Sequence, residues 1–138
     1  MKILVTGANG FIAKNLIQYL SEKENIELLK LYRDTSDQEL AQVVLSAEWI
    51  VHLAGVNRPK NDAEFIEGNV SLTEKICDIL KNHQKQTPII LSSSIQAEKD
   101  NVYGQSKLGG EQALTQLNLE NGNPIYISRM VNVFGKWS

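Results

Sequence analysis

The chain has 138 residues, which is enough for one domain with a single hydrophobic core. Hydrophobic residues make up 42% and charged residues 22%, and a net charge of −2 excludes the basic character expected of a protein that binds nucleic acid or an anionic membrane. A single cysteine, Cys77, excludes an intrachain disulfide and a thiolate metal cluster, and we expect no metal site.

The setting of Cys77 is an apolar helical stretch, which predicts a buried structural thiol rather than a nucleophile. No apolar run approaches the ~20 residues that span a bilayer, and the chain starts directly on a strand-like segment without a signal peptide. We therefore expect a cytoplasmic protein.

Short β-branched runs alternate with longer helical patterns along the chain, which is typical of a parallel sheet covered by helices on both faces. Most of the strand-like runs are nearly continuously apolar, as expected for strands buried on both faces. The predicted strands are Lys2–Thr6, Ile26–Tyr32, Trp49–Leu53, Ile89–Ser92 and Ile125–Ser128, and the predicted helices lie at about Phe11–Ser21, Asp37–Leu45, Asp62–Asn82 and Tyr103–Asn121.

This order predicts the α/β fold class: a doubly wound parallel sheet of the Rossmann type, a three-layer sandwich over residues 1–138. A domain of this type normally continues with further strands and a lobe that binds substrate. We therefore expect residues 1–138 to be one domain from the N-terminal part of a longer protein, truncated before that substrate lobe.

A glycine loop joins the first predicted strand to the first helix. Gly7 permits a tight turn, Gly10 lets the backbone approach a pyrophosphate, and the helix N-terminus then binds that anion. Ala13 takes the place of a third glycine and is small enough for close packing. A turn-forming glycine pair in some other α/β fold is the alternative. The predicted contacts with the cofactor are Gly7, Asn9, Gly10, Phe11 and Ile12.

The end of the second predicted strand bears on the choice of dinucleotide. Arg33 comes first after the apolar run and is suited to pair with the 2′-phosphate of NADP(H), so we favour NADP(H) over NAD(H). The alternative is that Arg33 is an ordinary surface charge and that Asp34 accepts hydrogen bonds from the ribose of NAD.

The third predicted strand ends in small residues that would let the cofactor lie against the backbone, namely Leu53, Ala54 and Gly55. His52 stands within the apolar run, which predicts a packed core histidine rather than a proton-transfer group. Arg58, in the loop that follows, is equally compatible with a phosphate contact and with an ordinary exposed arginine.

Tyr103 and Lys107 form a Tyr-x-x-x-Lys motif on a predicted helix, where a spacing of four puts both side chains on one face. A phenol has an ordinary pKa of about 10, and a fixed cation beside it favours the phenolate, so the pair suits proton transfer. The preceding strand runs into three serines, Ser92 to Ser94, at the carboxyl end of a parallel strand, where such sheets bind ligands.

The segment from Thr6 to Ala13, TGANGFIA, resembles the TGxxGxxG/A fingerprint of the short-chain dehydrogenases and reductases, especially the extended, epimerase/dehydratase-like type that handles nucleotide sugars. The resemblance implies that Ser94, or alternatively Ser93, bonds the substrate carbonyl. It implies that Tyr103 transfers the proton, and that Lys107 lowers the pKa of the tyrosine and holds the nicotinamide ribose. Tyr103 and Lys107 would thus contact the cofactor too.

The same resemblance extends to two further helical residues. Asn69 is similar to the helical asparagine that supports the lysine through ordered water, although an exposed helical asparagine is the alternative. Glu111 continues the helix after the lysine in the run LGGE and corresponds to a structural glutamate.

A narrower resemblance rests on VHLAGVNRP, on SSSIQ followed shortly by YGQSKLGGEQ, and on NVFGKW. These segments are similar to the reductase domain of bacterial capsular-polysaccharide enzymes in which a reductase is fused to a C-terminal cupin. That resemblance implies NADPH-dependent reduction of the C4 ketone of a UDP-N-acetyl-6-deoxy-4-hexulose, and we expect a homodimer of the full-length protein. The alternatives are an epimerase that retains NAD and a non-catalytic nucleotide-binding fragment, whereas Ile95-Gln96 after the serines argues against a dehydratase.

Overall fold

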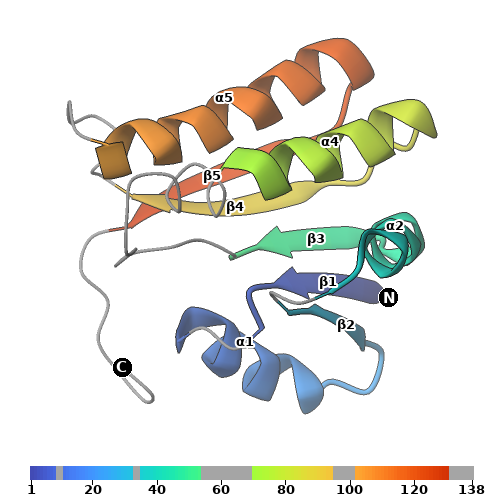
Figure 1. The fold of residues 1–138 in the computed structure, drawn as a ribbon. Helices are drawn as coiled ribbons and strands as arrows, with labels where there is room; N and C mark the ends of the chain where they lie inside the picture. Colours follow the sequence, from blue (N-terminus) through green and yellow to red (C-terminus); the bar gives the residue numbers. More distant parts are fainter. Residues whose placement is uncertain (9–10, 33–34, 54–69, 95–101, 131–138) are drawn as a thin grey trace.

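The computed structural model describes residues 1–8, 11–32, 35–53, 70–94 and 102–130, without the side chains of residues 11, 94, 102–104, 106 and 130. Five strands form one parallel sheet with the order β2-β1-β3-β4-β5 (Figure 1). The strands are β1 (Lys2–Thr6), β2 (Glu27–Leu31), β3 (Trp49–His52), β4 (Ile89–Ser94) and β5 (Ile125–Met130).

Helices cover both faces of this sheet, which confirms the predicted doubly wound sandwich. The helices are α1 (Phe11–Ser21), α2 (Asp37–Ser46), α4 (Leu72–Asn82) and α5 (Val102–Asn121). Leu4, Ile50 and Ile89 point from the strands into one core with α2, α4 and α5. Ile3 and Val5 point to the opposite face, where they pack with Ala13 of α1. Among the described residues, no helix is long and apolar enough to cross a bilayer.

Local sequence signals explain where the helices begin and end. The side chain of Ser36 caps α2 by accepting a hydrogen bond from the backbone N–H of Glu39 (3.2 Å). Gly122 ends α5 with a φ of +82°, a conformation that glycine adopts without a steric penalty. The predicted helix from Asp62 is described only from residue 70 onward, and α4 itself begins at Leu72.

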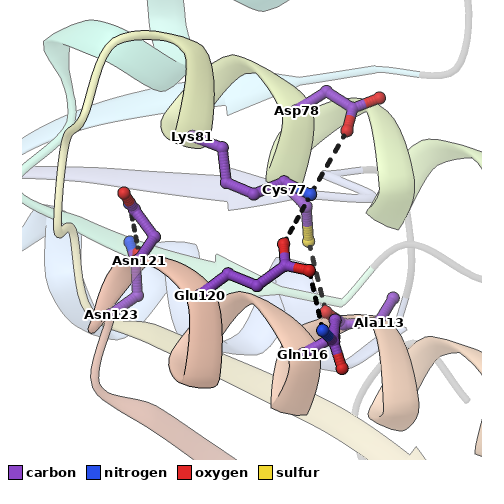
Figure 2. A network of polar contacts seen from close by, with 8 residues as sticks. All are labelled: Cys77, Asp78, Lys81, Ala113, Gln116, Glu120, Asn121 and Asn123. Atoms are coloured by element: carbon purple, nitrogen blue, oxygen red, sulfur yellow. Dashed lines mark hydrogen bonds and ion pairs between the residues drawn. The ribbon is translucent and has the colours of Figure 1, made fainter.

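Helices α4 and α5 pack side by side, and Figure 2 shows the polar contacts between them. Lys81 of α4 forms an ion pair with Glu120 of α5 (3.0 Å), and Gln116 also donates to that carboxylate (2.7 Å). Cys77 lies beneath these contacts with its Sγ atom 3.8 Å from the carbonyl oxygen of Ala113. Burial raises the pKa of Cys77 to about 12, which confirms the prediction of a buried structural thiol.

The last two strands extend further than the sequence pattern predicts. The apolar run predicted that β4 ends at Ser92 and β5 at Ser128, but the strands remain paired through Ser93 opposite Arg129 and Ser94 opposite Met130. The reason is that β4 and β5 pair with each other beyond the end of β3. Their last residues belong to the sheet because the two strands are paired there, and an apolar pattern does not mark them. The serine triplet therefore lies within a strand.

Candidate active site

The strand order has a topological switch point between β1 and β3. From β1 the chain moves to β2 on one side and then returns to β3 on the other side, so the strand order reverses at β1. In open parallel sheets, ligands bind outside the carboxyl ends of the strands at such a switch point. The glycine loop follows β1 and the predicted cofactor residue Leu53 follows β3, so the two segments flank this switch point.

The described part of the glycine loop suits a pyrophosphate. Gly7 has a φ of +66°, which allows the sharp turn after β1, and the backbone N–H of Ala8 donates to the carbonyl of Leu31 at the end of β2 (3.2 Å). Ala13 is buried against the sheet, as a small residue at that position predicts. The first turn of α1 has no acidic residue that would oppose an anion at the helix N-terminus.

A buried histidine connects the two strands of the switch point. The Nδ1 atom of His52 lies 2.7 Å from the Oγ1 atom of Thr6, and its Nε2 atom lies 2.8 Å from the Oγ1 atom of Thr73 in α4. The backbone N–H of Leu53 also donates to Thr6 Oγ1 (2.9 Å). Burial lowers the pKa of His52 to about 4, and the charge of Lys107 contributes. The histidine is therefore neutral at physiological pH, which confirms the prediction of a packed core residue.

The helix with the Tyr-x-x-x-Lys motif begins at the same edge of the sheet. Figure 1 shows the first turn of α5 on the side toward which the strand arrows point. Tyr103 and Lys107 fall in the first two turns of this helix, and Lys107 is partly buried. Burial lowers the pKa of Lys107, and its charge acts on His52 at the end of β3. The charge of the motif lysine thus acts at the carboxyl end of β3.

Ser93 belongs to a polar cluster that the serine pattern alone did not reveal. Its hydroxyl donates to the Oε2 atom of Glu111 in α5 (2.7 Å), and both residues are buried. Arg129 of β5 donates to the same carboxylate from Nε (2.9 Å to Oε2) and Nη2 (2.8 Å to Oε1). These contacts give Ser93 a structural partner, which favours Ser94 over Ser93 as the residue available to a substrate.

The predicted site residues differ in how far the structure describes them. Gly7, Ile12, Leu53 and Lys107 are described fully, whereas for Phe11, Ser94 and Tyr103 only the position in a helix or strand is described. The predicted residues that lie outside the described ranges are Asn9, Gly10, Arg33, Ala54, Gly55 and Asn69, together with the alternatives Asp34 and Arg58.

Two features of the site were not predicted from the sequence. They are the contacts of Thr73 and Arg129, and each of these residues acquires its partner through tertiary packing. One signal was available for Arg129: a charge inside an otherwise apolar strand pattern requires a partner when the strand is packed against a helix. No comparable signal marked Thr73.

A family comparison identifies the class of protein to which the chain belongs. The family model described as "NAD dependent epimerase/dehydratase family" matches residues 3–138, nearly the whole chain. The chain belongs to this family. Membership confirms the predicted resemblance to the extended short-chain dehydrogenases and reductases and implies a nicotinamide cofactor.

Individual relatives agree with this assignment. The chain is 46% identical over its full length to a Pseudomonas aeruginosa protein named UDP-2-acetamido-2,6-beta-L-arabino-hexul-4-ose reductase, of which it covers 37%. Its structure matches the capsular polysaccharide assembling protein CapF from Staphylococcus aureus with a TM-score of 0.85 and 50% identity, covering 99% of this chain and 37% of that one. The chain thus spans little more than a third of the length of these two relatives.

A more distant structure supports the fold alone. UDP-glucuronic acid 4-epimerase from Bacillus cereus, solved in complex with NAD, matches with a TM-score of 0.81 at 21% identity, covering 94% of this chain and 56% of that one. The shared architecture is the parallel sheet with its flanking helices.

Proposed function

We propose that this chain is the cofactor-binding and catalytic part of an NADPH-dependent reductase that acts on the C4 ketone of a UDP-N-acetyl-6-deoxy-4-hexulose, in the synthesis of capsular or other surface polysaccharide precursors. One observation carries the proposal: Glu111 of α5 is hydrogen-bonded to β4. The first two turns of α5 include Tyr103 and Lys107, and β4 ends at Ser94, so this bond holds the two elements with the proposed catalytic residues together. The name of the Pseudomonas aeruginosa relative supports the same substrate class.

The residues at the switch point fit a nicotinamide dinucleotide. The turn at Gly7 and a first turn of α1 without an acidic residue suit the pyrophosphate, and Lys107 is suited to hold the nicotinamide ribose. When bound, the reduced cofactor would supply the hydride. Arg33 supports NADP(H) over NAD(H), because a guanidinium matches the 2′-phosphate that distinguishes the two cofactors.

The roles of the chain's own residues follow from their chemistry. Tyr103 donates its proton to the oxygen of the former ketone, and the charge of Lys107 stabilises the phenolate that remains. Ser94 donates a hydrogen bond to the carbonyl oxygen and stabilises the charge that develops there. His52 stays neutral beside Lys107 and so adds no second positive charge to the site.

The proposal is tested by substituting Tyr103→Phe in the natural polypeptide that carries this chain. With a UDP-linked 4-keto sugar, the unaltered protein should oxidise NADPH in amounts equal to the sugar consumed, and the variant should lose at least about 100-fold in kcat. Unchanged turnover in the variant would contradict the catalytic role. Conversion of the sugar without net NADPH oxidation would instead indicate an epimerase, and cofactor binding without any conversion would indicate a non-catalytic module.

Two further expectations accompany the proposal. We expect the active protein to be a homodimer, which sedimentation at micromolar concentration would detect. We also expect it in the cytoplasm, where nucleotide sugars and reduced nicotinamide cofactors are available. A monomer with full activity would contradict the first expectation, and recovery of the protein in a secreted fraction would contradict the second.

A further inference from the structure

A three-residue cluster joins the candidate catalytic helix to the two strands beside it. Ser93 and Arg129 lie directly opposite each other on β4 and β5, and both side chains bond the carboxylate of Glu111 above them. We call this set the Glu111 clamp: Ser93, Glu111 and Arg129. It fixes three elements to one another at a single level of the sheet.

The clamp has the chemistry of a rigid connection. The guanidinium of Arg129 meets the carboxylate with two parallel hydrogen bonds, a geometry that restricts both side chains more than a single contact would. Burial alone would raise the pKa of Glu111, but the hydrogen bonds from Arg129 and Ser93 and the charge of Arg129 outweigh that effect and lower it. The carboxylate is therefore ionised at neutral pH and retains these bonds.

Helix α5 also contacts the sheet through apolar side chains. Leu114 and Leu117 are fully buried in the apolar core, where packing is largely non-directional. The carboxyl half of α5 is also held by the exposed pair Lys81–Glu120, which contacts α4 and not the sheet. The clamp adds to this apolar packing a set of directional side-chain hydrogen bonds between α5 and the strands β4 and β5.

The clamp residues Ser93 and Glu111 are close in sequence to the proposed catalytic residues. Ser93 immediately precedes Ser94, and Glu111 follows Lys107 by four residues, one helical turn. Any sliding of α5 along β4 would therefore alter the spacing between the serine and the Tyr103–Lys107 pair. A misplacement of about 1 Å in such a set costs roughly 100-fold in rate.

We propose that Glu111 and Arg129 are positioning residues, which hold α5 against β4 in the register that Ser94, Tyr103 and Lys107 need in order to act. This inference rests on the proposed reductase function. It assigns the clamp residues a role in the rate of reaction in addition to their role in stability. Neither residue needs to contact substrate or cofactor.

The test compares clamp variants with a matched control in the natural polypeptide. Glu111→Gln and Arg129→Lys keep the size and much of the polarity of each side chain but remove the charged two-point contact. Glu120→Gln removes an ion pair from the same helix at a position away from the sheet (Figure 2). At a temperature where all variants are folded, kcat should fall roughly 10- to 100-fold for the clamp variants and remain within about two-fold for Glu120→Gln.

A second pair of variants separates positioning from folding. Ser93→Ala removes one hydroxyl, whereas Ser93→Thr retains it, so activity should fall in the first and be largely restored in the second. The KM for the sugar should change much less than kcat, because the clamp does not touch the substrate. The dissociation constant for NADPH should rise a few-fold in Glu111→Gln, because Lys107 would no longer be held in place.

The possible results separate the two proposals. If the folded clamp variants keep kcat and NADPH affinity within about two-fold of the unaltered protein, the clamp is structural only and the inference is wrong. The same conclusion follows if activity falls only in proportion to the unfolded fraction. If the unaltered protein does not reduce a 4-keto sugar, the proposed function fails, and the NADPH affinities of the variants and of Glu120→Gln still decide whether the clamp positions Lys107.

Discussion

Replacement of His52 by glutamine tests whether burial at the switch point keeps this histidine neutral and makes the stability of the chain depend on pH. In the folded chain the pKa of His52 falls from 6.5 to about 4, through burial first and the charge of Lys107 second. The folded state therefore stays neutral between pH 6.5 and 4, while the unfolded state takes up a proton. Because the unfolded state binds more protons in this window, the free energy of unfolding is highest above pH 6.5 and falls as the pH drops toward 4.

The size of this effect follows from the pKa difference. A change of one in pKa corresponds to about 1.4 kcal/mol, so the difference between 6.5 and about 4 predicts a loss of about 3 kcal/mol by pH 4. At pH 7.5, His52→Gln should itself cost about 1–3 kcal/mol, because the contacts with Thr6 and Thr73 are lost or weakened. The stability difference between the two proteins should therefore shrink to near zero or reverse at pH 4.5.

Urea unfolding followed by circular dichroism at pH 7.5, 6.5, 5.5 and 4.5 measures these differences. His83→Gln is the matched control, because His83 is the second of the two histidines and lies exposed at the end of α4. The control should follow the unaltered protein within about 0.5 kcal/mol at every pH. A stability difference between His52→Gln and the unaltered protein that stays constant from pH 7.5 to 4.5 would show that burial does not keep His52 neutral.

Three other substitutions or reactions test the fold around the site. Gly7→Ala, at a φ of +66°, should destabilise the chain by about 1 kcal/mol and weaken NADPH binding, and equal Kd values by titration would contradict the role of this turn. Leu117→Ala should cost about 2–5 kcal/mol in urea unfolding, whereas the exposed Leu119→Ala should cost less than about 0.5. Cys77 should react with a thiol reagent at pH 8 only after unfolding, because burial raises its pKa to about 12, and rapid reaction of the folded chain would argue against its burial.

The fold was largely predictable because its signals are local. Continuous apolar runs such as Lys2–Thr6 indicate strands buried on both faces, and the glycine after Asn121 marks the end of the last described helix. The ends of β4 and β5 were predicted two residues too early. Three of the four residues concerned, Ser93, Ser94 and Arg129, are polar, and the pairing of Ser93 with Arg129 and of Ser94 with Met130 makes them part of the sheet.

The candidate site was predictable in its motifs but not in its supporting contacts. The spacing of Tyr103 and Lys107 depends on helix geometry alone, so sequence reveals it directly. The bond between Ser93 and Glu111 joins residues 18 positions apart and depends on how α5 packs on β4. Sequence spacing therefore left Ser93 and Ser94 as alternatives, whereas the buried hydroxyl of Ser93 favours Ser94 for the substrate.

The most direct test of the reductase assignment follows the hydrogen itself. The natural polypeptide would be incubated with a UDP-linked N-acetyl-6-deoxy-4-keto sugar and NADPH in which both hydrogens on C4 of the nicotinamide are replaced by deuterium, and the sugar product would be examined by NMR and mass spectrometry. We expect one deuterium at C4 of the sugar for each NADPH oxidised. A product without deuterium at C4, or conversion of the sugar without NADPH oxidation, would show that the protein is not a reductase of the C4 ketone.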